Sequence, residues 1–146
     1  MREREGAALS GGLLSLLAEI ENELSVVQDR APHRVEAERD RLRRSVAELL
    51  NGRTLDEQRL SQEIAILADK LDITEEIVRL NTHIAACRGM IGTGGAVGRQ
   101  LSFLGQEMLR EVNTIGSKAN DATIAHRVIA MKGIVEKIRE QVENLE

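Results

Sequence analysis

The sequence predicts an all-α protein, with long amphipathic helices that form helical hairpins with coiled-coil-like seams and assemble into an oligomer. The core must consist of Leu, Ile, Val, Met and Ala, because Phe103 is the single aromatic residue, and a sheet would favour aromatic and β-branched side chains. Apolar residues recur at alternating steps of three and four, which is the spacing of a helix seam. One proline and a few glycine-containing breaks separate these periodic stretches.

The first helical stretch is expected from about Leu13 to Leu50. Its seam comprises Leu13, Leu17, Ile20, Leu24 and Val27, and continues with Val35, Leu42 and Leu49. Pro32 is expected to kink or divide this helix, because proline lacks the N–H of a helical hydrogen bond. Asn51 and Gly52 form a typical helix stop.

The second helical stretch is expected to begin at a capping box, with Thr54 as N-cap and Glu57 three residues later, and to reach about Met90. A second cap pattern at Asp72 to Glu75 predicts a bend or a new start within it. One face carries Leu60, Ile64, Leu67 and Leu71. The loop from Gly92 to Gly98 lacks the Gly-Lys-Ser/Thr ending of a phosphate-binding P-loop, which favours a simple helix connection.

Two further helices follow, and both carry regular seams. The helix from about Arg99 to Ser117 is expected to turn inward Leu101, Leu104, Met108, Val112 and Ile115. Asn120 or Asp121 should cap the last helix, whose seam is Ile124, Val128, Met131, Val135, Ile138, Val142 and Leu145. Seams this long must be buried in hairpins or between subunits, so we expect residues 1–146 to form a single helical domain and a homo-oligomer.

Composition excludes several protein classes. No apolar stretch approaches the roughly 20 residues of a membrane span, and the charged N-terminus does not resemble a signal peptide. Cys87 is the single cysteine, which excludes an internal disulfide and a Cys-based zinc site and fits a reducing, cytoplasmic location. The net charge of −4 does not by itself indicate a nucleic-acid protein. Six arginines between Arg30 and Arg44 alternate with acids, which favours an ion-paired, solvated helix face.

Two segments carry more polar chemistry than a solvated face needs. Between Arg59 and Ile84, Glu76, Arg79 and His83 are spaced to share one helix face. A carboxylate, a guanidinium and an imidazole on one face are suited to proton transfer near a phosphodiester, although surface ion pairing explains the same spacing. Between Gln106 and Asp121, Glu107 and Glu111 share a face at i and i+4.

These segments closely resemble the C-terminal half of the YicC-like (YicC/YloC) family of bacterial endoribonucleases. The matching runs are "DEQRLSQEIAILADKLDITEEIVRLNTHI" and "VGRQLSFLGQEMLREVNTIGSKANDATIAHRVIAMKGIVEKIREQVENLE". The run "REGAALSGGLLSLLAEIENEL" is similar to the helix that leads into them, so nearly the whole chain is covered. The family chain is about twice as long and begins with a further domain. This sequence also differs from the usual family pattern at three positions: it has Ser102 where Asp is usual, Leu109 where Asn is usual, and Cys87 where an aromatic residue is common.

The resemblance implies a metal-dependent endoribonuclease that cleaves single-stranded RNA as a ring-like oligomer in the bacterial cytoplasm, with Mn²⁺ or Mg²⁺ as cofactor. The candidate catalytic residues are His83, as the acid or base, with Glu76 and Arg79. The candidate metal ligands are Glu63, Asp69, Glu76, Glu107 and Glu111, the densest acids of the matching runs. The candidate RNA-binding residues are Lys70, Arg79, Arg99, Arg110 and Lys118. The alternative is a non-catalytic helical module that oligomerises or holds RNA.

Overall fold

The computed structural model describes residues 2–93 and 97–145, with side chains at 9–92 and 97–144. It confirms an all-α fold, without a strand among the described residues. The helices are α1 Arg2–Leu50, α2 Glu57–Leu71, α3 Thr74–Thr93, α4 Gly98–Ser117 and α5 Ala122–Leu145. Among the described residues, none of these helices combines the length and the apolar character that crossing a bilayer requires.

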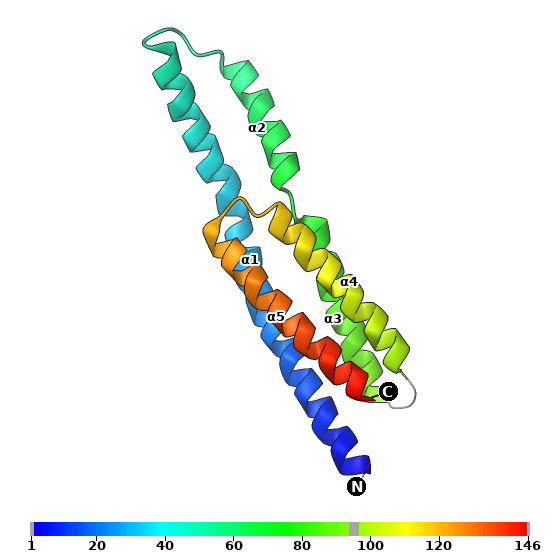
Figure 1. The fold of residues 1–146 in the computed structure, drawn as a ribbon. Helices are drawn as coiled ribbons and strands as arrows, with labels where there is room; N and C mark the ends of the chain where they lie inside the picture. The colour runs from blue at the N-terminus through cyan, green and yellow to red at the C-terminus, as the bar shows by residue number, and fades with distance from the viewer. Residues whose placement is uncertain (1, 94–96, 146) are drawn as a thin grey trace.

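Four helices form an antiparallel bundle, and a two-helix arm extends from it (Figure 1). The first half of α1 packs against α5 and α3, and α4 packs against α3 and α5, so the four helices enclose one core. The second half of α1 and all of α2 continue beyond the bundle as a hairpin (Figure 1). Within the described part of the chain, α2 packs only against α1. Apart from its C-terminal end, which adjoins the bundle at Leu71, α2 therefore lies away from the bundle's other faces.

The predicted seams form the core of the bundle. The α1 seam from Leu13 to Val27 is buried, and so is the α4 seam from Leu101 to Ile115. Along α5, every predicted seam residue from Ile124 to Val142 is buried; the side chain of Leu145 lies outside the described ones. Because α1 and α4 of the same chain cover this seam, its burial does not require another subunit. Self-association stays a prediction.

Two local predictions were wrong, and of the two outcomes expected at Pro32, a kink or a division, the division is not found. Pro32 does not divide α1, which continues to Leu50; residue 32 is exposed, so solvent can satisfy the carbonyl that loses its partner. Leu49 is 85% exposed and is not a seam residue, because the hairpin turn leaves the last turn of α1 uncovered. The N-cap of α2 is Asp56 rather than Thr54, since the Asp56 carboxylate accepts from the Arg59 N–H at 3.1 Å.

The predicted break at Asp72 is confirmed. Its carboxylate accepts from both the N–H and the hydroxyl of Thr74, at 2.9 and 2.5 Å, and these bonds hold its pKa below the usual value. The chain thus ends α2 at Leu71 and starts α3 at Thr74. At the last helix, Asp121 rather than Asn120 acts as the cap, because it accepts from the Ile124 N–H at 3.1 Å.

Candidate functional site

The polar segments of α3 and α4 face each other along the border between these two neighbouring helices. On α3, Leu80 and Ile84 enter the core, which places His83 at the border of α3 that is turned toward α4. On α4, Met108 and Val112 enter the core, and Glu107 and Glu111 flank them. The two helices are antiparallel neighbours, so residues far apart in the sequence meet at this border.

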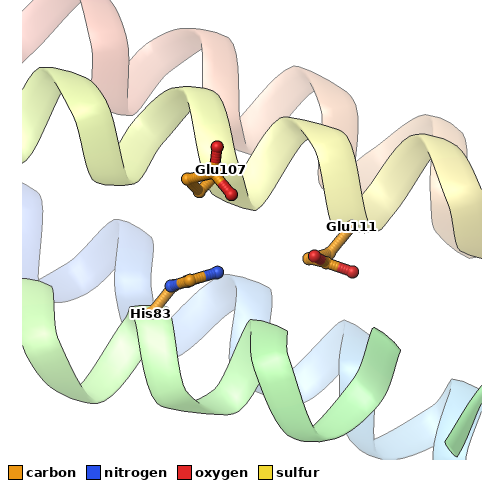
Figure 2. A group of neighbouring side chains, drawn as sticks. All are labelled: His83, Glu107 and Glu111. Carbon is orange, nitrogen blue, oxygen red and sulfur yellow. The ribbon is translucent and has the colours of Figure 1, made fainter. Parts of the chain in front are cut away.

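Three of these side chains form a group with metal-binding potential. His83, Glu107 and Glu111 each offer one ligand atom, and these atoms lie within 4.8 Å of one another. Figure 2 shows the imidazole pointing from α3 toward the two carboxylates of α4. His83 and Glu107 are partly buried, and Glu111 is only 3% exposed. The set therefore combines two acids and an imidazole, all at least partly buried.

His83 has a polar atom without a protein partner. Its Nε2 is buried and makes no hydrogen bond in the described structure. Buried polar atoms are normally paired, so such an atom calls for a partner that the protein itself does not supply. Imidazole nitrogens and carboxylates are common ligands of divalent cations. These residues therefore fit a divalent cation, provided that the side chains draw closer, because ligands of one such ion lie about 3 to 4 Å apart.

A chain of ion pairs extends from this group along the same border. Arg79 Nε donates to Glu111 Oε1 at 2.9 Å, and Arg79 also lies 3.6 Å from Glu76 Oε1. Lys118 Nζ donates to the same Glu76 oxygen at 2.9 Å. Glu76 is 4% exposed, so its charge is buried and balanced by these two cations. This pairing keeps the Glu76 carboxylate directed at cations of the protein rather than at the His83 group.

The structure does not bring all predicted ligands together. Glu63, Asp69 and Lys70 belong to α2, which packs only against α1 within the described residues. Glu63 and Lys70 line a pocket between α1 and α2, and Asp69 lines a pocket where the arm joins α1 and α3; none of the three belongs to the α3–α4 border. Arg99 lies in the first turn of α4, eight positions before Glu107 and thus about 12 Å along the helix axis. Periodicity could not reveal that α2 lies apart from the α3–α4 border, because it does not show which helices pack together.

Arg110 is the basic residue best placed to meet a ligand from solvent. Its side chain is 75% exposed, and its nearest acid, Glu107, lies at 3.8 Å. An exposed pair at this distance holds the guanidinium weakly. Arg110 is therefore available to a phosphate beside the His83 group, whereas Arg79 and Lys118 already bind buried acids.

Arg34 is a structural residue of this region that the sequence-based interpretation missed. It was assigned to a solvated arginine-rich face, yet it is only 4% exposed. Its guanidinium donates to the carbonyls of Leu71, Lys118 and Ala119, at 2.6, 2.7 and 3.1 Å. These bonds hold the end of α2 against the turn that carries Lys118. Burial lowers the Arg34 pKa, and the charges of Asp121 and Asp72 offset part of this effect.

A signal for Arg34 was present in the sequence. The steps of four and three that link Leu13 to Val27 continue through Ala31 to position 34, so Arg34 occupies a seam position. A charged residue in a seam register indicates a buried, bonded side chain more than a solvated one.

Comparison with known proteins gives consistent matches. Residues 27–146 match the family model described as "Endoribonuclease YicC-like, C-terminal". A protein named "Probable endoribonuclease YicC" from Clostridioides difficile is 42% identical over 147 residues, which cover 100% of this chain and 50% of that protein. A protein of the same name from Haemophilus influenzae is 38% identical, with the same coverage of both chains. The chain thus spans about half the length of the curated relatives it matches.

Proposed function

The chain belongs to the family of YicC-like endoribonucleases, and from this premise we propose that it cleaves single-stranded RNA with a divalent cation held between α3 and α4. The observation that carries the proposal is the group of His83, Glu107 and Glu111, whose ligand atoms lie within 4.8 Å of one another. Mn²⁺ or Mg²⁺ would be the cation, and a cytoplasmic location suits a chain that acts on RNA.

In this proposal His83, Glu107 and Glu111 hold the cation. When bound, it would polarise a phosphoryl oxygen and lower the pKa of bound water. His83 would then act as a ligand, in place of the acid or base role inferred from the sequence. Glu76 would act by keeping Lys118 and Arg79 in place, at 2.9 and 3.6 Å.

The RNA backbone would lie along the rim of the same border. Arg110 would contact a phosphate first, since its side chain is 75% exposed. Arg79, whose side chain is 46% exposed, lies next to the cation ligands and would hold a phosphate close to them. Lys70 and Arg99 lie too far from this group to share one phosphate with it. They would contribute only along a longer path of RNA.

A cleavage assay on the full chain tests the proposal. Internal cleavage of a 5′-labelled single-stranded RNA is expected to yield shorter labelled fragments with Mn²⁺ or Mg²⁺, and the RNA should stay intact with EDTA. The same RNA annealed to its complement should be cleaved more slowly if single strands are the substrate. Because the relatives are about twice as long, the alternative is a half-length module that assembles or holds RNA without turnover. RNA that is bound but uncut at every cation concentration would favour this alternative.

A further inference from the structure

Arg79 lies where the candidate cation group meets solvent. Its guanidinium donates to Glu111 at 2.9 Å and to Glu75 at 3.2 Å, and it also lies 3.6 Å from Glu76. The hydrogen bonds to Glu111 and Glu75 raise the Arg79 pKa above its ordinary value. The side chain is nevertheless 46% exposed, so solvent reaches Arg79 despite these bonds.

The strongest of these partners also belongs to the cation group. Glu111 is 3% exposed, and it contributes one of the three ligand atoms beside His83 and Glu107. Figure 2 shows its carboxylate at the edge of the group. A bound divalent ion would therefore lie a few ångströms from the guanidinium. Two cations at that distance repel each other, and the low polarity around a buried carboxylate strengthens the repulsion.

The remaining partners do not hold Arg79 as firmly. Glu75 is 83% exposed on its side chain, and exposed pairs of this kind contribute little. Glu76 accepts a hydrogen bond from Lys118 at 2.9 Å, whereas Arg79 lies farther from it, at 3.6 Å, so Lys118 is the closer of the two cations that balance its charge. Once the bond to Glu111 is weakened, the guanidinium can turn to solvent with little loss.

We propose that Arg79 and the divalent cation compete for Glu111, and that cation binding releases Arg79 to hold an RNA phosphate. This inference rests on the proposed function, because it concerns the same cation group. Arg79 then couples the two ligands: RNA that captures the released guanidinium favours the cation, and the cation favours RNA to the same extent. The opposite role, in which Arg79 orients Glu111 for the cation, predicts effects of the opposite sign.

Calorimetric titration of the full chain with MnCl₂ tests the competition. Arg79→Gln removes the competing charge and keeps a polar side chain, so Mn²⁺ should bind about two- to fivefold more tightly than in the parent. Arg88→Gln is the matched control, because Arg88 lies on the same helix and pairs with Glu21 of α1 outside the group. It should bind Mn²⁺ as the parent does. Circular dichroism must show parental helicity for both variants.

RNA binding tests the coupling. The affinity for a fluorescent single-stranded 2′-O-methyl RNA, measured by anisotropy, should rise with Mn²⁺ in the parent and in Arg88→Gln. In Arg79→Gln this rise should shrink severalfold. Unchanged or weaker Mn²⁺ binding in Arg79→Gln, or an equal rise in RNA affinity, would overturn the inference and leave the cation site standing. A parent that binds no Mn²⁺ would overturn the proposed cation site together with the inference.

Discussion

Glu107→Gln is expected to remove the cation-dependent part of RNA cleavage, with a loss of at least about a hundredfold in rate. The substitution keeps the shape of the side chain and replaces a charged ligand by a neutral amide. Glu107 is partly buried beside His83 and Glu111, so no other described acid stands ready to replace it in this group. Initial cleavage rates across an Mn²⁺ titration measure the effect.

Glu63→Gln is the matched control, because Glu63 was a predicted ligand but lies on α2, apart from the group. It should cleave like the parent.

His83→Ala then separates the two roles of His83. Loss of a ligand should weaken Mn²⁺ binding and cleavage together, whereas loss of an acid or base should lower the rate by about 10²–10⁴-fold and leave Mn²⁺ affinity intact. Parental cleavage by both Glu107→Gln and His83→Ala would show that the site lies elsewhere.

Val135→Glu is expected to destabilise the fold by several kcal/mol, and the variant should be largely unfolded at room temperature. Val135 is 0% exposed and lies on α5, which packs against α1 and α4. A carboxylate there would lose its hydration without gaining a partner. Thermal unfolding followed by circular dichroism measures the change in stability.

Ile129→Glu is the control for this substitution, because Ile129 lies on the same helix and is 69% exposed. It should change the melting temperature little. If Val135→Glu melted like Ile129→Glu, the seam of α5 would not be packed within the bundle as described.

The helices were predictable because each carries a periodic seam that must be buried. The 4-3 steps of α5 fixed which side of that helix enters the core, and every described seam residue is buried. The outcome at Pro32 was less predictable, since a helix can continue through a proline where solvent reaches the carbonyl that the missing N–H leaves without a partner. The seam also could not reveal whether its covering helices come from the same chain.

The candidate site was predictable in part. Position along α3 and α4 gave the residues at the border, and Glu107, Glu111 and His83 do lie together. Glu63 and Asp69 were grouped with them because acids are dense in that part of the sequence. The structure separates them, since the chain breaks at Asp72, α2 packs along α1, and α3 belongs to the bundle. Glu76 is also set apart from the other predicted ligands, because it forms an ion pair with Lys118. Only the packed structure shows this ion pair.

Anomalous diffraction from crystals grown with MnCl₂ shows whether a divalent cation binds between α3 and α4. We expect a manganese peak within bonding distance of His83, Glu107 and Glu111, and the loss of this peak in Glu107→Gln crystals. Peaks found only at Glu63 or Asp69 on the arm, or a peak that persists in Glu107→Gln, would contradict this expectation.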